Sequence, residues 1–486
     1  MNFVEDVLEG FVSSKPALVT IARDGERRVW HFGELIARSA GLSGAFAARG
    51  VGRGDVVMTL VGNRIEWVLA MLACWRMGAI AMPCNTQLRR HDLELRVGVA
   101  NPVLCVGEDG PLGELPDGIP YMTMDEVGTV MDEDRPQEPP VEPADLGPDD
   151  AALVIFTSGT TGEPRGALHV QRYLPGQRVQ AVHWFGSHEG ELAWCTAATG
   201  WSKSSRNAFV APWLTGAAAL MHDGRFDPEE RLGLLEKERV NVLCQAPTEY
   251  RMIAKRATVR ALPSMRRMVS AGEALNPEVI AEFSDRAGLK IADGYGQTET
   301  GALTGVRPGE DLKPGSMGRP LPGIALRISS GELQLRATSC PTFFAGYLGS
   351  EGGPELIDGE WWPTGDYVRE DEDGTLWFEG RGDDIIVSAG YRIGPYEVES
   401  ALVSHPAVAE AAAVSAPDPE RGSVVRAIVV LRDGEPSDGL ARELQDHVKS
   451  VTAPYKYPRI VEFADQLPKT DSGKIKRTQL RGDDPG

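Results

Sequence analysis

The segment that most restricts the fold of this chain is residues 157–166, Thr-Ser-Gly-Thr-Thr-Gly-Glu-Pro-Arg-Gly, which directly follows the apolar run 151–156. The run has the length and composition of a buried strand, so a sheet should lead straight into this glycine-rich loop. Backbone N–H groups and side-chain hydroxyls of such a loop can converge on a phosphate. The alternative interpretation is a flexible turn without a ligand. Because no Gly-Lys-Ser/Thr sequence ends the loop, a P-loop nucleotide hydrolase is disfavoured.

Two helix starts, each close to an apolar run, predict an α/β fold. Residues 227–229, Asp-Pro-Glu, combine an N-cap residue, a first-turn proline and an early acid, and they predict a helix that continues to about Val240. The same signal recurs at residues 276–278, Asn-Pro-Glu, just after the strand candidate 267–271. Helices that alternate with strands imply crossover connections within a sheet.

The length of the chain and a change of pattern near residue 380 predict two domains. A chain of 486 residues is too long for a single hydrophobic core. The acidic, proline-rich stretch 131–150 should be an exposed connection within the first part. After residue 380, short strands alternate with helices expected at 395–404 and 440–450, which is typical of a small α+β domain.

Composition excludes several classes of protein. The net charge of −20 would repel a nucleic-acid backbone, so no nucleic-acid partner is expected. Residues 1–12 are acidic and lack the pattern of a secretory signal. The apolar runs are far shorter than the roughly 20 residues of a membrane span. The six cysteines form no Cys-x-x-Cys pair, which predicts buried free thiols in a cytoplasmic protein without a zinc site or disulfides.

Four further motifs follow the glycine-rich loop along the chain. They are 293–300 (Asp-Gly-Tyr-Gly-Gln-Thr-Glu-Thr), 364–366 (Thr-Gly-Asp), 380–384 (Gly-Arg-Gly-Asp-Asp) and 468–477 (Pro-Lys-Thr-Asp-Ser-Gly-Lys-Ile-Lys-Arg). In this order the five segments resemble the core motifs of the acyl-adenylate-forming superfamily, which includes acyl- and aryl-CoA synthetases, luciferases and the adenylation domains of peptide synthetases. The resemblance runs from about Trp30 to Arg477, and the chain is most similar to medium-chain and benzoate-type acyl-CoA synthetases.

This resemblance implies a two-step reaction. A small carboxylic acid attacks ATP to give acyl-AMP and pyrophosphate, and the thiol of coenzyme A then takes the acyl group and releases AMP. ATP, Mg²⁺ and coenzyme A are the implied cofactors and co-substrates, and the chain is expected to act as a monomer or a homodimer. A free-standing carrier protein as the acceptor and a non-catalytic nucleotide sensor are the two alternatives.

The resemblance also implies a role for each motif at the nucleotide. Thr160 and Thr161 would hold the phosphates, and Glu299 together with Thr160 would hold Mg²⁺. Thr298 would donate a hydrogen bond to the α-phosphate, and Lys474 would lie over that phosphate and the reacting carboxylate, where one cation offsets the repulsion of two anions. The residues expected to contact ATP or AMP are Thr157, Ser158, Gly159, Thr160, Thr161, Gly162, Gly272, Glu273, Ala274, Asp293, Gly294, Tyr295, Asp366 and Arg381.

Three of these residues have distinct expected contacts. Tyr295 offers an aromatic face to the adenine. Asp366 should accept hydrogen bonds from both ribose hydroxyls, and Arg381 should add a charge-assisted contact to the same nucleotide.

The same resemblance implies a mobile C-terminal domain. Residues 1–382 would form a large N-terminal domain of several subdomains with mixed sheets and crossover helices, and residues 383–486 would rotate as a small α+β domain about a hinge at Asp383. This rotation would withdraw Lys474 and present Ala389, Gly390, Tyr391 and Arg392 to coenzyme A. Two positions depart from the family pattern: Ala389 replaces a common serine, and Arg165 replaces a lysine and receives no catalytic role.

Three residues are expected to line the acyl pocket: Trp201, Gly296 and Gln245. Acetate-activating relatives carry a tryptophan at the position of Gly296, so the glycine is expected to leave the pocket floor open. The sequence therefore predicts a medium-length aliphatic or an aromatic acid, and replacement of Gly296 by tryptophan should favour shorter acids. A core aromatic is the alternative interpretation of Trp201.

Overall fold

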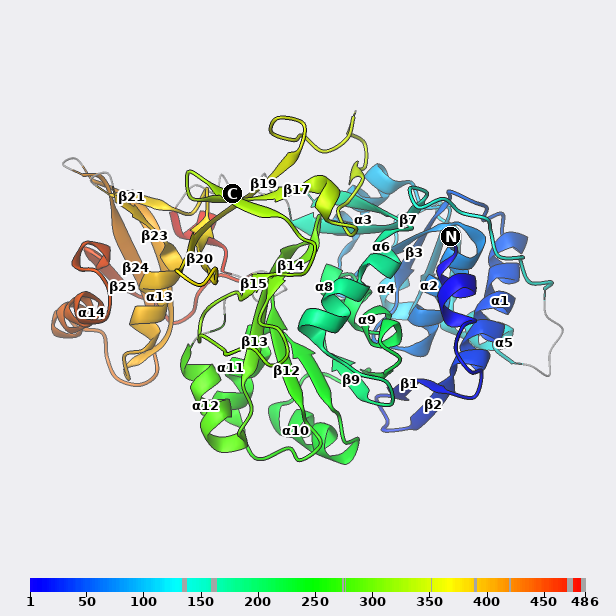
Figure 1. Ribbon diagram of the computed structural model, residues 1–486, viewed down its shortest axis with the longest axis horizontal. Coiled ribbons are helices and arrows are strands. Elements are labelled where there is room, and N and C mark those ends of the chain that lie inside the picture. Colours follow the sequence, from blue (N-terminus) through cyan, green and yellow to red (C-terminus); the bar gives the residue numbers. More distant parts are fainter. Residues whose placement is uncertain are drawn as a thin grey trace.

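The computed structural model describes residues 1–132, 138–158, 164–272, 275, 277–350, 352–388, 391–418, 421–469 and 475–481, without the side chains of Ser158 and Arg392. It has a large lobe that contains the N-terminus and a smaller lobe formed by the last part of the chain (Figure 1). The described helices and strands alternate along most of the chain, so the α/β class is confirmed.

The first sheet of the large lobe has nine strands in the order β15-β14-β13-β12-β11-β9-β10-β1-β2. Its strands from β13 to β1 are parallel, and the strands at both edges are antiparallel. Helices α10 (Pro228–Lys237), α11 (Pro247–Arg256) and α12 (Pro277–Ala287) cover one face through a shared hydrophobic core. The strands are β1 (Pro16–Ile21), β2 (Arg27–His31), β9 (Leu192–Cys195), β10 (Ala218–His222), β11 (Val242–Gln245), β12 (Arg267–Ala271), β13 (Ile291–Gln297), β14 (Gly301–Gly305) and β15 (Arg319–Pro320).

The second sheet has seven strands in the order β18-β8-β7-β4-β3-β5-β6. The largest hydrophobic core joins it to the first sheet and includes nearly all of α2 (Ile65–Met77). The strands are β3 (Val56–Leu60), β4 (Ile80–Pro83), β5 (Leu104–Gly107), β6 (Tyr121–Thr123), β7 (Ala151–Ser158), β8 (Pro164–Val170) and β18 (Gly346–Tyr347). The further helices of this region are η1 (Val4–Leu8), α1 (Phe32–Ala48), α3 (Arg90–Ala100), α4 (Asp109–Leu112), α5 (Met124–Val130), α6 (Tyr173–Gly176), α7 (Arg178–Gln180), η2 (Ala181–Phe185), α8 (Ser202–Asn207) and α9 (Val210–Leu214).

A third sheet of four strands leads to the small lobe. Its order is β16-β17-β19-β20, with β16 (Leu326–Ser329), β17 (Glu332–Arg336), β19 (Trp361–Glu370) and β20 (Leu376–Arg381), and the short helix η3 (Ala337–Ser339) follows β17. The small lobe contains a hairpin of two strands and a sheet in the order β23-β24-β25. Its elements are β21 (Ile386–Ser388), β22 (Tyr391–Ile393), α13 (Pro395–Val403), β23 (Val408–Asp418), β24 (Gly422–Leu431), α14 (Asp438–Val451), η4 (Pro454–Lys456), β25 (Ile460–Phe463) and α15 (Arg477–Arg481).

Local signals predicted several elements closely. Strand β12 has the predicted bounds, and helix α10 starts as predicted because Asp227 accepts hydrogen bonds from the backbone N–H groups of Glu229 and Glu230 at 3.0 and 2.9 Å. The helix ends at Lys237, three residues before Val240. All six cysteines are free and buried, as predicted. Within the described part of the chain, no helix is long and apolar enough to cross a membrane.

The stretch 131–150 is less exposed than its composition predicts. Leu146 is only 2% exposed, and the backbone oxygen of Ala144 accepts a hydrogen bond from Asn2 Nδ2 at 3.1 Å. The backbone oxygen of Val141 likewise accepts from Arg76 Nε at 2.8 Å. The prediction of an exposed connection was wrong at these positions, because the N-terminal segment and α2 hold the stretch against the lobe.

Candidate nucleotide and acyl site

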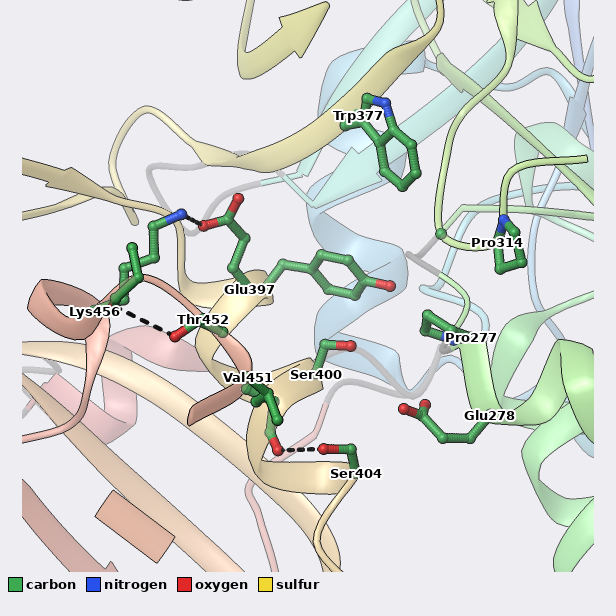
Figure 2. Close-up of a pocket in the computed structure, with 14 residues that line it drawn as sticks. Pro277, Glu278, Pro314, Trp377, Glu397, Ser400, Ser404, Val451, Thr452 and Lys456 are labelled. Carbon is green, nitrogen blue, oxygen red and sulfur yellow. Dashed lines mark hydrogen bonds and ion pairs between the residues drawn. The ribbon is translucent and has the colours of Figure 1, made fainter. Parts of the chain in front are cut away.

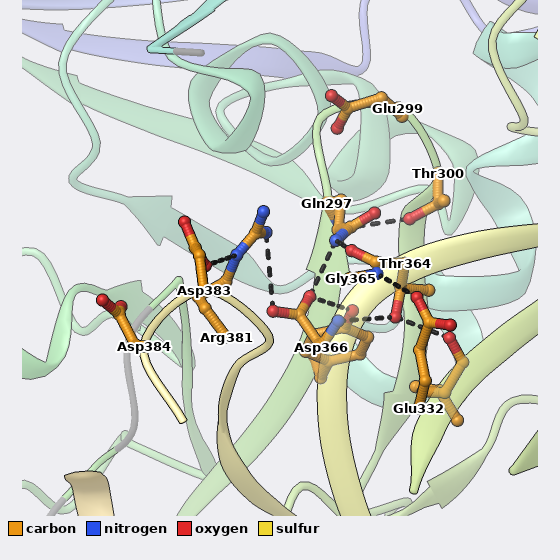
Figure 3. Close-up of polar contacts among 12 residues, drawn as sticks. Gln297, Glu299, Thr300, Glu332, Thr364, Gly365, Asp366, Arg381, Asp383 and Asp384 are labelled. Carbon is orange, nitrogen blue, oxygen red and sulfur yellow. Dashed lines mark hydrogen bonds and ion pairs between the residues drawn. The ribbon is translucent and has the colours of Figure 1, made fainter. Parts of the chain in front are cut away.

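Strands β13, β19 and β20 bring three predicted nucleotide residues together around one buried carboxylate. Asp366 Oδ2 accepts hydrogen bonds from Tyr295 Oη at 2.5 Å and from Gln297 Nε2 at 2.7 Å (Figure 3). Arg381 Nη1 lies 3.5 Å from Asp366 Oδ1, because the antiparallel register of β19 and β20 places the two residues opposite each other. Asp366 is 3% exposed. The site therefore holds a preorganised acceptor beside an aromatic ring and a cation.

The residues around Tyr295 and Arg381 raise the pKa of both side chains. Burial and the neighbouring Asp366 raise the pKa of Tyr295 well above its usual range, so its hydroxyl remains a donor. Burial alone would lower the pKa of Arg381, but Asp366 and Asp383 outweigh that effect and raise it. Gln297 was not among the predicted site residues. Its position within the motif 293–300 was the available signal, because it follows Tyr295 on the same face of a strand.

Glu299 lies apart from Asp366, on the far side of Gln297 in Figure 3. Its Oε1 accepts a hydrogen bond from Tyr347 Oη at 2.6 Å, and its backbone oxygen accepts from the N–H of Phe344 at 2.8 Å. The guanidinium carbon of Arg165 lies 3.5 Å from the centre of the Tyr347 ring. Arg165 is on β8 and Tyr347 is on β18, which pair, so the strand that leaves the glycine-rich loop supports the ring that contacts Glu299.

The surroundings of Glu299 fit a Mg²⁺ ion held mainly by a substrate. Among the described residues, no group of three or more His, Cys, Asp or Glu side chains could hold a metal ion. Mg²⁺ commonly takes one or two carboxylates and completes its shell with phosphate oxygens and water. Glu299 supplies such a carboxylate, and Thr160 lies outside the described residues.

The predicted adenine residues meet at the ends of two neighbouring parallel strands. Ala271 of β12 lies opposite Gly294 of β13, which places Gly272 near Tyr295. A Cβ atom at Gly294 would lie 2.4 Å from Trp184 Nε1, so only glycine fits there. Asp293 is buried, and its Oδ1 accepts a hydrogen bond from the Gly294 N–H at 3.0 Å.

Several predicted residues lie outside the described part of the chain. These are Gly159, Thr160, Thr161, Gly162, Glu273, Ala274, Ala389, Gly390 and Lys474, together with the side chains of Ser158 and Arg392. Thr157 lies near the end of β7, and Asp383 Oδ1 lies 3.8 Å from Arg381 Nε. Tyr391 is half exposed and stacks on Tyr455 with ring centres 4.5 Å apart.

The three predicted acyl-pocket residues lie on different elements of the large lobe. Trp201 is the partly buried N-cap residue of α8. Gln245 Oε1 accepts a hydrogen bond from Arg231 Nη1 of α10 at 3.1 Å, so its carboxamide points toward the helices that cover the outer face of the sheet. A Cβ atom at Gly296 would lie 1.9 Å from the backbone oxygen of Gly301. The missing side chain of Gly296 therefore gives room to strand β14, and the expected open pocket floor at this glycine is not found.

This contact changes the expected result of a substitution at Gly296. Gly296→Ala should destabilise the protein by about 1–3 kcal/mol, because the added methyl group meets backbone atoms that cannot move without disturbing β13 and β14. Thermal unfolding would measure the effect. Gly98→Ala is the control, since a Cβ at Gly98 in helix α3 meets no atom within 4 Å. An unchanged unfolding temperature for Gly296→Ala would contradict this steric account.

Sequence comparisons place the chain in a family of nucleotide-dependent enzymes. The AMP-binding enzyme family matches residues 5–340, and the AMP-binding enzyme C-terminal domain matches residues 397–474. The chain belongs to the AMP-binding enzyme family.

Individual relatives share nearly the whole chain. The uncharacterized acyl-CoA ligase YtcI of Bacillus subtilis (strain 168) is 38% identical over 496 residues, which cover 96% of this chain and 93% of YtcI. The mitochondrial acyl-coenzyme A synthetase ACSM3 of Mus musculus is 36% identical, with 99% and 90% covered. The crystal structure of the anthranilate CoA ligase AuaEII in complex with anthranoyl-AMP superposes with a TM-score of 0.88 at 29% identity and covers 99% of this chain and 97% of AuaEII.

Proposed function

We propose that this chain is an AMP-forming acyl-CoA synthetase, which joins a carboxylic acid to coenzyme A at the expense of ATP. The observation that carries this proposal is the buried group of Tyr295, Asp366 and Arg381, which provides an aromatic face, a carboxylate for ribose hydroxyls and a cation at one place. The acyl-CoA ligases and synthetases among the relatives support the same activity.

In the first step the acid attacks the α-phosphorus of ATP, and pyrophosphate leaves. Thr298 donates a hydrogen bond to the α-phosphate, and Lys474 reduces the repulsion between the two reacting anions. Glu299 would hold Mg²⁺, which neutralises charge on the phosphates when it is bound. In the second step the thiol of coenzyme A attacks the mixed anhydride, and AMP is released.

The two steps need different surroundings, so we assign residues 1–382 and 383–486 to two domains that rotate about Asp383. A cavity of about 560 Å³ between the two lobes supports this assignment. Figure 2 shows Pro277 and Trp377 of the large lobe on one side of it and Lys456 of the small lobe on the other. Such a space allows the lobes to move without breaking a continuous core.

The proposal extends to the class of acid and to the location of the enzyme. The anthranilate and benzoate CoA ligases among the similar solved structures favour an aromatic acid, with a medium-length aliphatic acid as the alternative and a place in the metabolism of fatty or aromatic acids. The six buried free cysteines favour the reducing cytoplasm.

Pyrophosphate release tests the function directly. Purified protein with ATP, Mg²⁺ and a panel of acids should release pyrophosphate only when an acid is present, and coenzyme A should then yield an acyl thioester. Release that depends on the acid but gives no thioester would instead indicate a carrier protein as the acceptor. A protein that binds ATP and releases no pyrophosphate with any acid would refute the enzymatic proposal.

Tyr347 offers a further prediction at the Mg²⁺ site. Burial and the Glu299 carboxylate raise the pKa of Tyr347, so its hydroxyl keeps the proton that it donates. Tyr347→Phe should lower kcat/KM for ATP about 10- to 100-fold and raise the Mg²⁺ concentration needed for half-maximal rate, because a hydrogen bond to a charged group contributes about 1.5–3 kcal/mol. Tyr121→Phe, at an exposed tyrosine, is the control. An unchanged Mg²⁺ dependence would remove Tyr347 from the site.

A further inference from the structure

A group of buried polar side chains near α6, α7 and α8 lacks hydrogen-bond partners. The atoms without a partner among the described residues are both carboxamide atoms of Gln177, Oε1 of Gln180 and Nε of Arg206. The ring of His169 lies against the Thr298 backbone, and the Tyr173 hydroxyl lies against Ser202 and Arg206, without a hydrogen bond of ordinary length. None of these five residues, which we call the polar cluster, is more than 5% exposed. Because buried polar groups in folded proteins are nearly always paired, such a concentration indicates a site for a polar ligand.

Arg206 gives the polar cluster its charge. Its Nη1 donates to Ser202 Oγ at 3.1 Å, and no described carboxylate lies within ion-pair distance of it. His169 adds no second positive charge, because burial and then the nearby Arg206 lower its pKa to about 3. By contrast, the two other buried arginines described in this lobe each have a carboxylate partner, since Arg231 lies 3.3 Å from Glu249 and Arg76 lies 3.9 Å from Glu9. A buried cation without a counter-charge is costly, so the function of Arg206 is best explained by an anion that arrives with the substrate.

The polar cluster adjoins the predicted reaction site. The His169 ring stacks near Tyr173, with ring centres 4.1 Å apart, and lies beside the backbone of Thr298. Gln177 Nε2 is 3.8 Å from the position of a Cβ atom at Gly301, two residues after Glu299. Ser202, the hydrogen-bond partner of Arg206, directly follows Trp201. An acid whose carboxylate lies at Thr298 and whose body passes Trp201 would therefore extend toward the cluster.

We propose that the acid activated by this chain carries a second carboxylate and that Arg206 binds it. The inference rests on the proposed function and narrows its substrate class to dicarboxylic acids. The Tyr173 hydroxyl and Gln177 Nε2 would donate further hydrogen bonds to this carboxylate. A site built of buried donors discriminates strongly against an analogue that lacks the matching acceptor, because the donors are then left unpaired.

Matched pairs of acids test this proposal through pyrophosphate release. The pairs are hexanoate with adipate, octanoate with suberate, and benzoate with isophthalate and terephthalate. For at least one pair, the wild-type protein should show kcat/KM about 100-fold higher for the dicarboxylate. Arg206→Met should remove this preference by lowering the value for the dicarboxylate about 100-fold while the monocarboxylate is unaffected or improved. Arg178→Met, at an exposed position of the neighbouring helix α7, should change neither value.

Stability provides a second readout that does not depend on turnover. Arg206→Met should raise the unfolding temperature of the ligand-free protein, because it removes a buried cation that has no counter-charge. Gln177→Leu is a second variant, since Gln177 side-chain atoms make no hydrogen bond within the described part of the chain, and it should also weaken the preference for the dicarboxylate.

The outcomes separate the two proposals. Monocarboxylates that remain the better substrates, with Arg206→Met and Gln177→Leu changing both members of a pair equally, would overturn the dicarboxylate inference and leave the synthetase activity intact. Failure of every acid in both classes to release pyrophosphate would refute the proposed function itself.

Discussion

Replacement of Lys474 by alanine is expected to slow acyl-adenylate formation by on the order of 10²–10³-fold, with ATP binding largely preserved. The reason is that the ammonium group stabilises charge that develops between the carboxylate and the α-phosphate, which matters most in the transition state. Single-turnover pyrophosphate release measures this step. A supplied acyl-adenylate should still react with coenzyme A at close to the wild-type rate.

The residues around Lys474 make this experiment specific. Lys469 and Ile475 form a β-bridge, and Arg477 Nη2 lies 2.7 Å from Glu399 Oε1 on α13. The alanine substitution therefore leaves the anchoring contacts in place. Lys476→Ala, at an exposed lysine two residues away, is the control and should keep both steps intact. An equal loss of both half-reactions in Lys474→Ala would contradict the rotation of the small domain.

Replacement of Asp366 by asparagine is expected to weaken ATP binding by about 100-fold. The Asp366 carboxylate accepts hydrogen bonds from Tyr295 and Gln297 and faces Arg381. An amide in its place would direct an N–H donor at these donors and would remove the nearer of the two carboxylates beside Arg381. The same change should lower the unfolding temperature of the ligand-free protein. Titration calorimetry with ATP and thermal unfolding measure the two effects separately.

The control for this change is Asp358→Asn, which makes the same chemical substitution at an exposed turn residue with φ of 54°. Asparagine tolerates this left-handed conformation, so neither ATP binding nor stability should change. Wild-type affinity for ATP in Asp366→Asn would mean that the ribose is held elsewhere, and the assignment of the nucleotide site would then be wrong.

Much of the fold could be predicted because its signals are local. The proline and acids that start α10, and the apolar run that forms β12, act within a few residues of the backbone that they shape. The same reasoning missed β23 (Val408–Asp418), whose alanine-rich sequence has weak intrinsic preference for a strand. It becomes a strand because it pairs along its length with β24, which is a contact between segments.

The sequence by itself determined the family, the order of the motifs and the identity of Tyr295, Asp366 and Arg381 as site candidates. Only the tertiary structure decided that Gln245 points toward Arg231, that Gly296 makes room for the backbone of Gly301 and that Arg165 supports the Tyr347–Glu299 contact. It also revealed Arg206 as a buried cation without a counter-charge. The physical reason is that a motif carries its chemistry in adjacent residues, whereas the direction of a side chain and its burial depend on strand register and on packing between distant segments.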